Sequence, residues 1–237
     1  MPGLHAKDSP GPARLRWLAP RCVVCTLAPG DPLCDGCAAD FFAAEVTRCT
    51  RCAARTASAA CLCGQCAAHP PHFDGTTALA DYAAPVAGMI AALKFSARID
   101  LAEAFAKLLA RRETEATGAL VVAVPLAFER QRERGFNQSL EIARRYGRHV
   151  GVKLPQAPLL RLRHGPPQQS LARDARQRNV RGAFGLVDAQ AATAVRDRTV
   201  IVIDDVMTTG STLDEIAATL KRAGAARVLN RVVARTP

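Results

Sequence analysis

Residues 200–212 read VIVIDDVMTTGST, and this stretch decides the fold. Its first four residues are apolar and β-branched, which is typical of a parallel strand buried on both faces. Two carboxylates follow, Asp204 and Asp205, and then a turn of small hydroxyl residues surrounds Gly210. From Leu213 onward, apolar residues recur at the i, i+3, i+4 and i+7 positions of an amphipathic helix. The stretch therefore predicts a strand, a tight loop and a helix in direct succession.

Both ends of this helix carry capping signals. Thr212 and Glu215 have the spacing of a capping box, which predicts that their side chains satisfy the first N–H groups of the helix. Gly224 stands where a C-terminal cap belongs, because glycine adopts the left-handed conformation without strain.

The loop and the carboxylates have the composition of a ribose 5-phosphate site. Backbone N–H groups and the dipole at a helix N-terminus favour a phosphate, and glycine lets the backbone approach it closely. The expected 5-phosphate ligands are Thr208, Thr209, Gly210, Ser211 and Thr212. Carboxylates accept hydrogen bonds and suit vicinal hydroxyls better, so Asp204 and Asp205 are expected to bind the ribose. No Gly-Lys-Ser/Thr follows the glycine, which excludes a Walker loop; the plain alternative is an ordinary strand, turn and capped helix.

All nine cysteines lie between residues 22 and 66, and eight of them form four Cys-x2-Cys pairs. Such pairs are a strong metal signal, because each turn presents two thiolates to one tetrahedral ion. Taken in order, they predict two structural zinc sites, the first from Cys22, Cys25, Cys34 and Cys37 and the second from Cys49, Cys52, Cys63 and Cys66. An interleaved pairing, Cys61 in place of Cys63, and an iron–sulfur centre remain open. The odd number of cysteines disfavours a disulfide framework.

Size and charge narrow the class of protein. With 237 residues, 49% of them apolar, the chain can form one core and a small module. No run approaches the roughly 20 apolar residues that span a bilayer, and the basic N-terminus lacks a signal-peptide core, so we expect no membrane span and a cytoplasmic location.

Of the net charge of +11, residues 128–184 carry +9, from thirteen Lys or Arg and four Asp or Glu. This indicates a polyanionic partner, either a pyrophosphate ligand or nucleic acid, unless it is only a solvated basic surface.

Composition divides the chain into three segments. Residues 1–20 read as a flexible leader, residues 21–70 as a double zinc ribbon and residues 71–237 as an α/β domain. In that domain we expect strands at 73–82, 121–124, 200–203 and 228–233, with helices starting near residues 86, 101, 137 and 213. This alternation predicts a parallel sheet flanked by helices. Residues 161–184 are polar and long enough for a loop over a site.

With these motifs in place, residues 22–236 resemble the competence protein F family of bacteria. The segment 204–212 resembles the diphosphoribosyl-binding signature of type I phosphoribosyltransferases, and LKF at 93–95, VPL at 124–126 and RGFNQ at 134–138 are further matching motifs. The resemblance implies an α/β fold with a type I phosphoribosyltransferase-like parallel sheet flanked by helices, preceded by a small zinc-ribbon module. It also implies a role in DNA uptake during natural transformation. The implied ligand is ribose 5-phosphate or phosphoribosyl diphosphate (PRPP) with Mg2+, held mostly by ligand oxygens and water.

The resemblance extends to further site residues. Phosphoribosyltransferases bind the pyrophosphate in a loop after an early strand, which implies Arg130, Arg132 and, favoured among them, Arg134 as ligands. Surface arginines on a helix are the alternative for Arg130 and Arg132. Lys94 either reaches a phosphate or caps a helix end. Asn137 and Gln138 are expected to cap the next helix, with contact to the ligand as the alternative. A hood over a base or over nucleic acid is expected from Gln168, Arg173, Arg176, Arg178, Asn179 and Arg181.

Three functions remain open. The first, which we favour, is a competence protein with a retained ribose-phosphate site, binding single-stranded DNA beside a helicase or a recombination mediator. The second is an active phosphoribosyltransferase that transfers ribose 5-phosphate from PRPP to an unidentified acceptor. The third is a sensor of PRPP without turnover. The low aromatic content of 5% argues weakly against a base-stacking platform.

Overall fold

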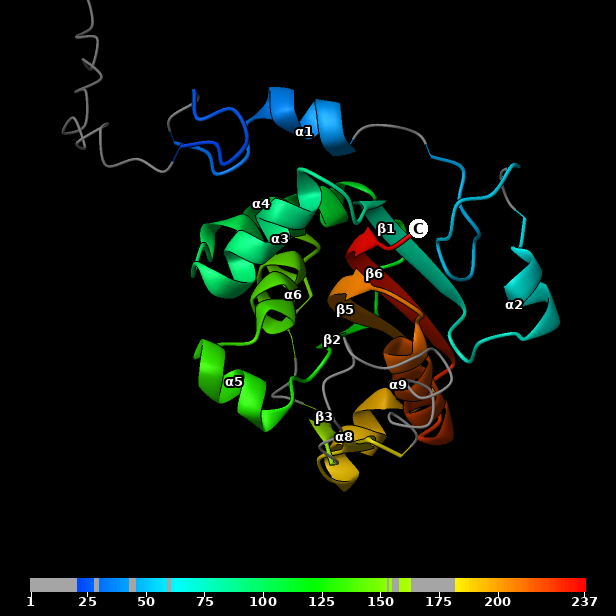
Figure 1. Cartoon of the computed structure of the whole chain (residues 1–237). Helices are drawn as coiled ribbons and strands as arrows, with labels where there is room; N and C mark the ends of the chain where they lie inside the picture. Colours follow the sequence, from blue (N-terminus) through cyan, green and yellow to red (C-terminus); the bar gives the residue numbers. More distant parts are fainter. Residues whose placement is uncertain are drawn as a thin grey trace, which may run out of the picture.

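The computed structural model describes residues 21–27, 30–42, 46–58, 61–152, 154, 158–162 and 182–237. Their centre is a parallel sheet in the order β1-β6-β5-β2 (Figure 1). Its strands are β1 (Gly75–Asp81), β6 (Arg227–Arg235), β5 (Thr199–Met207) and β2 (Leu120–Ala123). In the register of β5, Ile203 lies opposite Ala123 of β2 and Arg231 of β6. The sheet and its flanking helices confirm the predicted fold class.

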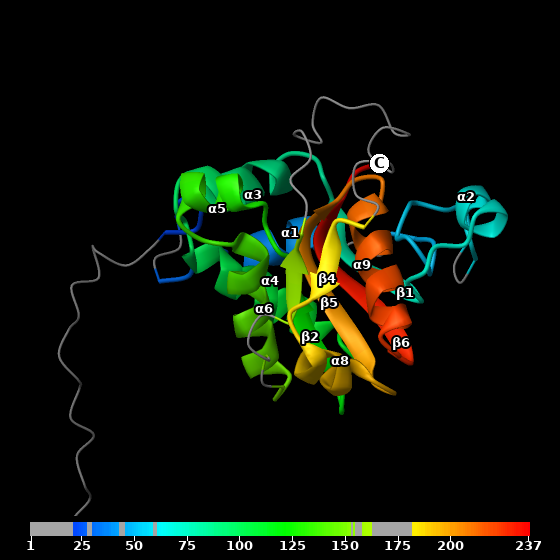
Figure 2. The same ribbon diagram turned by 90° about the horizontal axis from the view of Figure 1, so that it is seen from below.

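Alternate residues of β5 face two separate helical layers, and residues 200–203 are fully buried. Ile201 and Ile203 pack on the side of α3 (Val86–Phe95), α4 (Asp100–Arg111) and α6 (Gln138–His149). Val200 and Val202 pack on the side of α8 (Ala189–Val195) and α9 (Ser211–Arg222). Figure 2 shows the sheet between α4 and α6 on one side and α9 on the other. A parallel strand covered on both faces has no polar side, which explains the unbroken apolar run at 200–203.

Several short elements were not predicted from the sequence. Strands β3 (Leu159–Arg161) and β4 (Phe184–Leu186) form an antiparallel pair at the two ends of the polar segment that was expected to be a loop. The arginine-rich segment after β2 forms a short helix, α5 (Phe128–Arg134). Elements of three to seven residues are too short to display a hydrophobic period, so their sequences carry little signal.

The two cysteine segments pack on opposite sides of the sheet. Helix α1 (Asp35–Phe42) contains Cys37 of the second cysteine pair, and its Phe42 ring meets Phe105 of α4 edge-on, with centroids 6.2 Å apart. Helix α2 (Gly64–Ala68) belongs to the later cysteine segment, whose Ala53 packs in the cluster of α9. Figure 1 shows α1 above α4 and α2 on the far side of β1. The division into a ribbon module at 21–70 and a domain at 71–237 stays a prediction.

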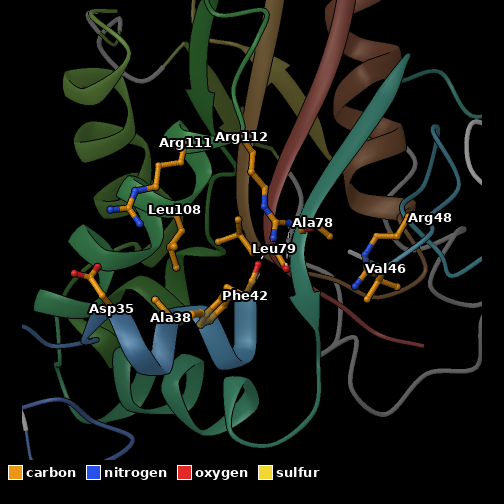
Figure 3. Close-up of a pocket in the computed structure, with 11 residues that line it drawn as sticks. Asp35, Ala38, Phe42, Val46, Arg48, Ala78, Leu79, Leu108, Arg111 and Arg112 are labelled. Atoms are coloured by element: carbon orange, nitrogen blue, oxygen red, sulfur yellow. Dashed lines mark hydrogen bonds between the residues drawn. The ribbon is translucent and has the colours of Figure 1, made fainter. Parts of the chain in front are cut away.

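Arg112, just after α4, joins α1 to the sheet. Its guanidinium donates to the carbonyl oxygens of Ala78 (3.1 Å) and Leu79 (3.3 Å) in β1 and to that of Phe42 in α1. These contacts lie beside a cavity of about 600 Å³ between α1 and β1 (Figure 3). Among the described residues, no helix has the length and apolarity needed to cross a bilayer.

A buried ion pair connects the end of α4 to β6. Arg231 donates to both carboxylate oxygens of Glu113, at 2.7 and 2.9 Å, and the Tyr146 hydroxyl of α6 donates to the same carboxylate. The Arg231 and Glu113 side chains are only 6% and 2% exposed. Burial alone would raise the pKa of Glu113, but the Arg231 and Tyr146 hydrogen bonds lower it to about 2. The pair therefore stays charged and contributes stability that is lost only as the pH falls toward that value.

Removing one partner of this pair should be strongly destabilising. Glu113→Ala leaves the Arg231 charge buried and unpaired, so we expect the free energy of unfolding to fall by about 3–5 kcal/mol in chemical denaturation. The control is Glu115→Ala, which removes a partly exposed ion pair with Arg227 and should cost about 1 kcal/mol or less. Similar losses in the two variants would contradict this view of the core.

Candidate functional site

Strand β5 carries both predicted ribose ligands at its C-terminal end. The strand continues to Met207, beyond the expected end at residue 203, because Asp204 and Val206 still pair with Val232 and Ala234 of β6. Successive strand residues point to opposite faces, so Asp204 and Asp205 have different surroundings. Asp205 is 4% exposed and Asp204 is partly buried.

Each carboxylate is held by a residue from a different helix. The Ser139 hydroxyl at the start of α6 donates to Asp204 Oδ1 at 2.9 Å. Lys94 Nζ in the last turn of α3 lies 2.5 Å from Asp205 Oδ2, an enclosed oxygen that accepts no well-aligned hydrogen bond from a described residue. The Lys94 charge therefore compensates the buried Asp205 carboxylate. Lys94 is 18% exposed in its side chain and faces the strand end, not the end of its own helix.

Asp204 is the residue whose ionisation is most perturbed at this site. Burial, followed by the neighbouring charge of Asp205, raises its pKa from 3.8 to about 7, although the Ser139 hydrogen bond and the Lys94 charge act in the opposite direction. A carboxyl group with this pKa takes up and releases a proton near neutral pH. It can thus present either a donor or only acceptors to a ligand hydroxyl.

Arg134 lies near Asp205 at the end of β5, whereas Arg130 and Arg132, the other two expected pyrophosphate ligands, lie on the surface of α5. Its guanidinium stacks on the Phe95 ring at 5.0 Å and donates to Gln138 Oε1 at 3.1 Å. Its Nε is enclosed without a hydrogen-bond partner among the described residues. Burial lowers the pKa of Arg134, and the nearby Asp205 charge partly opposes this. Arg130 pairs with Glu133 of its own helix, and Arg132 lies over the exposed ring of Phe128 at 5.8 Å.

The loop between β5 and α9 has the form of an anion cradle. Gly210 is the N-cap residue, and its φ of +83° lies in the left-handed region that favours glycine; a Cβ on it would also lie 2.6 Å from the flexible end of Met207. The hydroxyls of Thr209 and Ser211 lie 2.7 Å apart at the first turn. Thr208 is exposed, Thr209 and Thr212 are partly buried, and Ser211 is buried. The loop thus presents backbone N–H groups and hydroxyls at the start of a twelve-residue helix.

The capping predictions had mixed outcomes. The capping box is wrong, because α9 begins at Ser211 and Glu215 instead accepts from the Gly182 N–H at 2.9 Å. Gly224 has the expected left-handed conformation, with φ of +97°. Asn137 caps α6 as predicted, since its Oδ1 accepts from the N–H groups of Ser139 (2.9 Å) and Leu140 (3.2 Å). Gln138 is not a cap but the buried first residue of α6.

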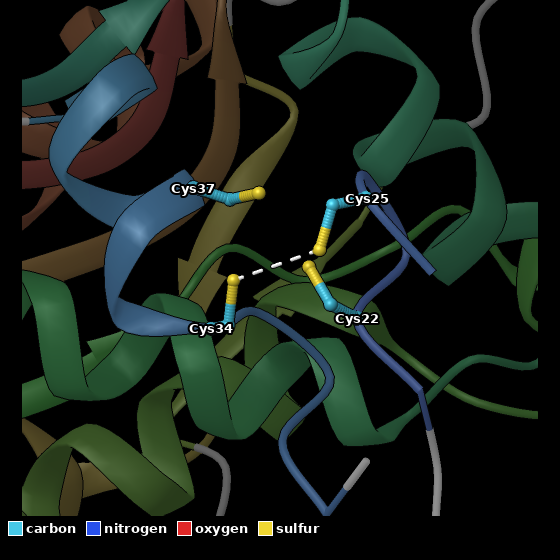
Figure 4. Close-up of side chains that lie close together, drawn as sticks. All are labelled: Cys22, Cys25, Cys34 and Cys37. Atoms are coloured by element: carbon cyan, nitrogen blue, oxygen red, sulfur yellow. Dashed lines mark hydrogen bonds between the residues drawn. The ribbon is translucent and has the colours of Figure 1, made fainter. Parts of the chain in front are cut away.

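The structure gathers the cysteines into two groups of four, in sequence order. In each group, all sulfur atoms lie within 4.8 Å of one another, and in Figure 4 the first four point toward a common centre. Four thiolates about 2.3 Å from a zinc ion form a tetrahedron with edges of about 3.8 Å. The Cys25–Cys34 and Cys52–Cys63 sulfur separations are 3.8 and 3.6 Å, so either group could hold a structural zinc ion. Cys61 lies outside both groups, and its thiol donates to the Ser58 carbonyl at 2.9 Å.

Backbone N–H groups lower the pKa of one thiol in each group, that of Cys22 in the first and that of Cys49 in the second. Burial would raise the pKa of Cys22 and of Cys49, but N–H donors of the following turn and the next cysteine pair outweigh it and lower these pKa values to about 6 and about 7. Burial raises the pKa of Cys37 to about 12. A bound cation would favour the thiolate form of all four sulfur atoms in a group, because metal ligands must be deprotonated.

Comparison with known proteins defines the family. Residues 104–236 match the model of the phosphoribosyl transferase domain. The DNA utilization protein YhgH of Escherichia coli K12 is 36% identical over 191 residues, which cover 78% of this chain and 82% of that protein. Competence protein F of Haemophilus influenzae is 30% identical over 199 residues, covering 81% of this chain and 85% of that protein. The chain therefore belongs to the phosphoribosyltransferase-domain proteins and, among them, to the competence protein F family.

Similarity to solved structures is weaker. The allosteric regulatory enzyme of purine biosynthesis has a TM-score of 0.39 at 22% identity, over 55% of this chain and 25% of that chain, which is too low to support an argument. The expected hood residues Gln168, Arg173, Arg176, Arg178, Asn179 and Arg181 lie outside the described residues, as does the expected leader. Ser139 was missed in the sequence, although it directly follows the RGFNQ motif.

The raised pKa of Asp204 predicts a pH-dependent stability. In the unfolded chain this carboxyl ionises near 3.8 and in the folded chain near 7, so its contribution is fully present below pH 4 and is lost as the pH rises through 7. Asp204→Asn should therefore gain stability relative to the wild type between pH 5 and pH 8, by about 1–2 kcal/mol after allowance for solvent at a partly exposed group. Thermal unfolding across this range measures the difference. Asp40→Asn, at an exposed site on α1, should show no such trend; a parallel trend in both variants would contradict the assignment.

Proposed function

We propose that this competence-family protein binds ribose 5-phosphate or PRPP at the C-terminal end of β5 and acts in DNA uptake. The observation that carries the proposal is the convergence of Asp204, Lys94 and Arg134 with the β5–α9 loop, all at one end of the strand. Acceptors for hydroxyl groups and donors for phosphates are thereby close to each other. This is the combination that a phosphorylated pentose requires.

In this proposal the two carboxylates have different tasks. Asp204 is partly exposed and accepts the ribose hydroxyl groups directly. Asp205 is enclosed and holds Lys94 in place. Lys94 and Arg134 then face the diphosphate of PRPP, whose Mg2+ is carried mainly by ligand oxygens and water. The 5-phosphate binds the loop 208–212, and Arg130 and Arg132 add positive charge at the entrance.

The DNA-related part of the proposal rests on the relatives and on charge. Relatives that cover about four fifths of the chain are named for DNA utilization and competence. The +9 charge of residues 128–184 suits a nucleic-acid backbone, so single-stranded DNA is the proposed polymer partner, with a helicase or recombination mediator as the protein partner. Zinc in the two cysteine groups and a cytoplasmic location, where thiols stay reduced, belong to the same proposal.

The alternative is an active phosphoribosyltransferase. The match to the transferase domain and the Asp204–Asp205 pair support it. Such an enzyme works by positioning the ligand and by stabilising developing charge, so it requires no nucleophile from the protein. A sensor that binds PRPP without turnover would use the same residues. Release of diphosphate from PRPP in the presence of candidate acceptors separates an enzyme from a binding protein.

Ligand binding tests the site directly. Calorimetric titration with PRPP and Mg2+ should show saturable binding that Asp204→Asn weakens about tenfold or more, or about 1.4 kcal/mol. The reason is that an amide replaces one of the acceptors for the ribose hydroxyls. Asp40→Asn should bind like the wild type. Equal affinity in the wild type and in Asp204→Asn would remove Asp204 from the site.

Salt dependence tests DNA binding. If the basic segment follows a DNA backbone, the affinity for single-stranded DNA should fall steeply with salt, with a log–log slope of about 0.7 per phosphate contact. Neutralising Arg173, Arg176, Arg178 and Arg181 to Ala should lower both the affinity and the slope, with little dependence on base sequence. A charge-matched control neutralises four exposed arginines outside residues 128–184, namely Arg21, Arg111, Arg196 and Arg222. Equal losses in the two variants would mean that only net charge matters.

A further inference from the structure

The second cysteine group is tied to the phosphate loop by one guanidinium. Arg235, the last residue of β6, lies opposite Met207, the last residue of β5. Its Nε donates to the carbonyl oxygen of Cys52 at 3.1 Å. One of its terminal nitrogens donates to the carbonyl oxygens of Met207 (3.4 Å) and Thr236 (2.6 Å). A single side chain thus connects the backbone of a cysteine-group residue to the start of the loop.

Apolar packing makes a second connection between the same two places. Phe73 is 2% exposed, and its ring packs beside Gly210: a Cβ added to Gly210 would lie 3.9 Å from Phe73 Cζ. Arg51, between Cys49 and Cys52, donates to the Phe73 carbonyl at 2.7 Å. Ala53 is fully buried in the same apolar cluster as Phe73 and Met207. The turn 49–53 is therefore connected to the loop by two routes, through Phe73 and through the hydrogen bonds of Arg235.

The loop depends on such outside support. Gly210 holds a left-handed conformation, with φ of +83°, and has no side chain that could fix it there. Among the described residues, the donors to the Met207 and Thr208 carbonyls come from Arg235 and Thr236. The Thr236 N–H lies 3.0 Å from the Met207 oxygen, and its hydroxyl lies 3.3 Å from the Thr208 oxygen. Of these two residues, Arg235 also contacts the turn that bears Cys52.

The first cysteine group has no comparable position. Cys22 and Cys37 are buried with Phe42 in the cluster that includes Phe105 of α4, on the other side of the sheet from Phe73 and Met207. In the part of the chain that the structure describes, the two groups have similar geometry, and only the second is joined to the loop at residues 208–212 through Arg235 and Phe73. This difference provides an internal control.

We propose that the second cysteine group, Cys49, Cys52, Cys63 and Cys66, positions the phosphate loop through Arg235 and Phe73, so that phosphate binding depends on the metal state of this group and not on that of the first. Arg235 is a positioning residue in this arrangement, because it acts on the loop backbone and not on the ligand. The inference rests on the proposed ribose-phosphate function. Its physical basis is preorganisation: a loop already held in the binding conformation loses less entropy when the phosphate binds.

The first experiment needs no ligand. Hydrogen–deuterium exchange of the full chain reports the opening of residues 207–213. We expect Arg235→Gln and Cys52→Ser to raise exchange there about tenfold. The matched controls are Arg227→Gln, at the opposite end of the same strand, and Cys25→Ser, in the first cysteine group. Both should leave the exchange of this segment unchanged.

Metal content and ligand affinity complete the test. Elemental analysis should give two zinc ions for Arg235→Gln and one for each cysteine variant. Titration with ribose 5-phosphate and with inorganic phosphate should show about tenfold weaker binding for Arg235→Gln and Cys52→Ser, and wild-type affinity for Arg227→Gln and Cys25→Ser. Arg235→Gln, which leaves all eight candidate metal ligands in place, keeps the test valid where a cysteine variant does not fold.

The outcomes separate this inference from the proposed function. If the wild type binds neither ligand, the ribose-phosphate site fails, while the exchange data still report whether Arg235 holds the loop. If loop exchange is unchanged in Arg235→Gln, the positioning role is overturned. If Cys25→Ser and Cys52→Ser raise loop exchange equally, metal loss acts on general stability, and the special role of the second group is overturned.

Discussion

The parallel pairing of β5 with both β2 and β6 determines where every other part of the site lies. Strand β5 is covered on both faces, so residues 200–203 are all apolar, and polar residues begin only at Asp204. Its pairing with β6 continues to Met207, so the two carboxylates stand at the strand end without a flexible linker. Helix α9 begins four residues after Met207, and the left-handed conformation of Gly210 allows the chain to turn from strand to helix within this short loop. The position of the loop at residues 208–212 is thus a direct consequence of the sheet.

Burying two neighbouring carboxylates is unfavourable unless each has a partner. The chain provides these partners from three separate helices: Lys94 from α3, Arg134 from α5 and Ser139 from α6. The pKa of Asp204 stays raised because burial and the Asp205 charge outweigh the Ser139 hydrogen bond and the Lys94 charge. A ligand that brings hydroxyl donors to Asp204 and phosphates to Lys94 and Arg134 would complete the compensation. On the proposed function, this electrostatic arrangement would favour a ligand with both kinds of group over a simple anion.

The sequence predicts the helices and strands that have a clear hydrophobic pattern, but it does not predict the contacts between them. Runs such as 121–124 and 228–233 identify strands because β-branched residues suit a doubly covered sheet. The continuation of β5 through Asp204 was not predicted, since carboxylates are poor strand formers and only pairing with Val232 places them there. Ser139 is 65 residues from Asp204, and Arg235 is 183 residues from Cys52, so neither contact leaves a local pattern. The cysteine spacing was informative because metal ligation is itself a local constraint.

The central claim is that the loop after β5 binds the phosphate of a phosphorylated ribose. The most direct measurement follows the backbone amide resonances of the full chain while PRPP and Mg2+ are added. The account predicts that the largest saturable shifts occur at Thr209, Gly210 and Ser211, with smaller ones at Asp204 and Asp205. Shifts that are absent from residues 208–212, or that appear only on distant basic surfaces, would contradict it.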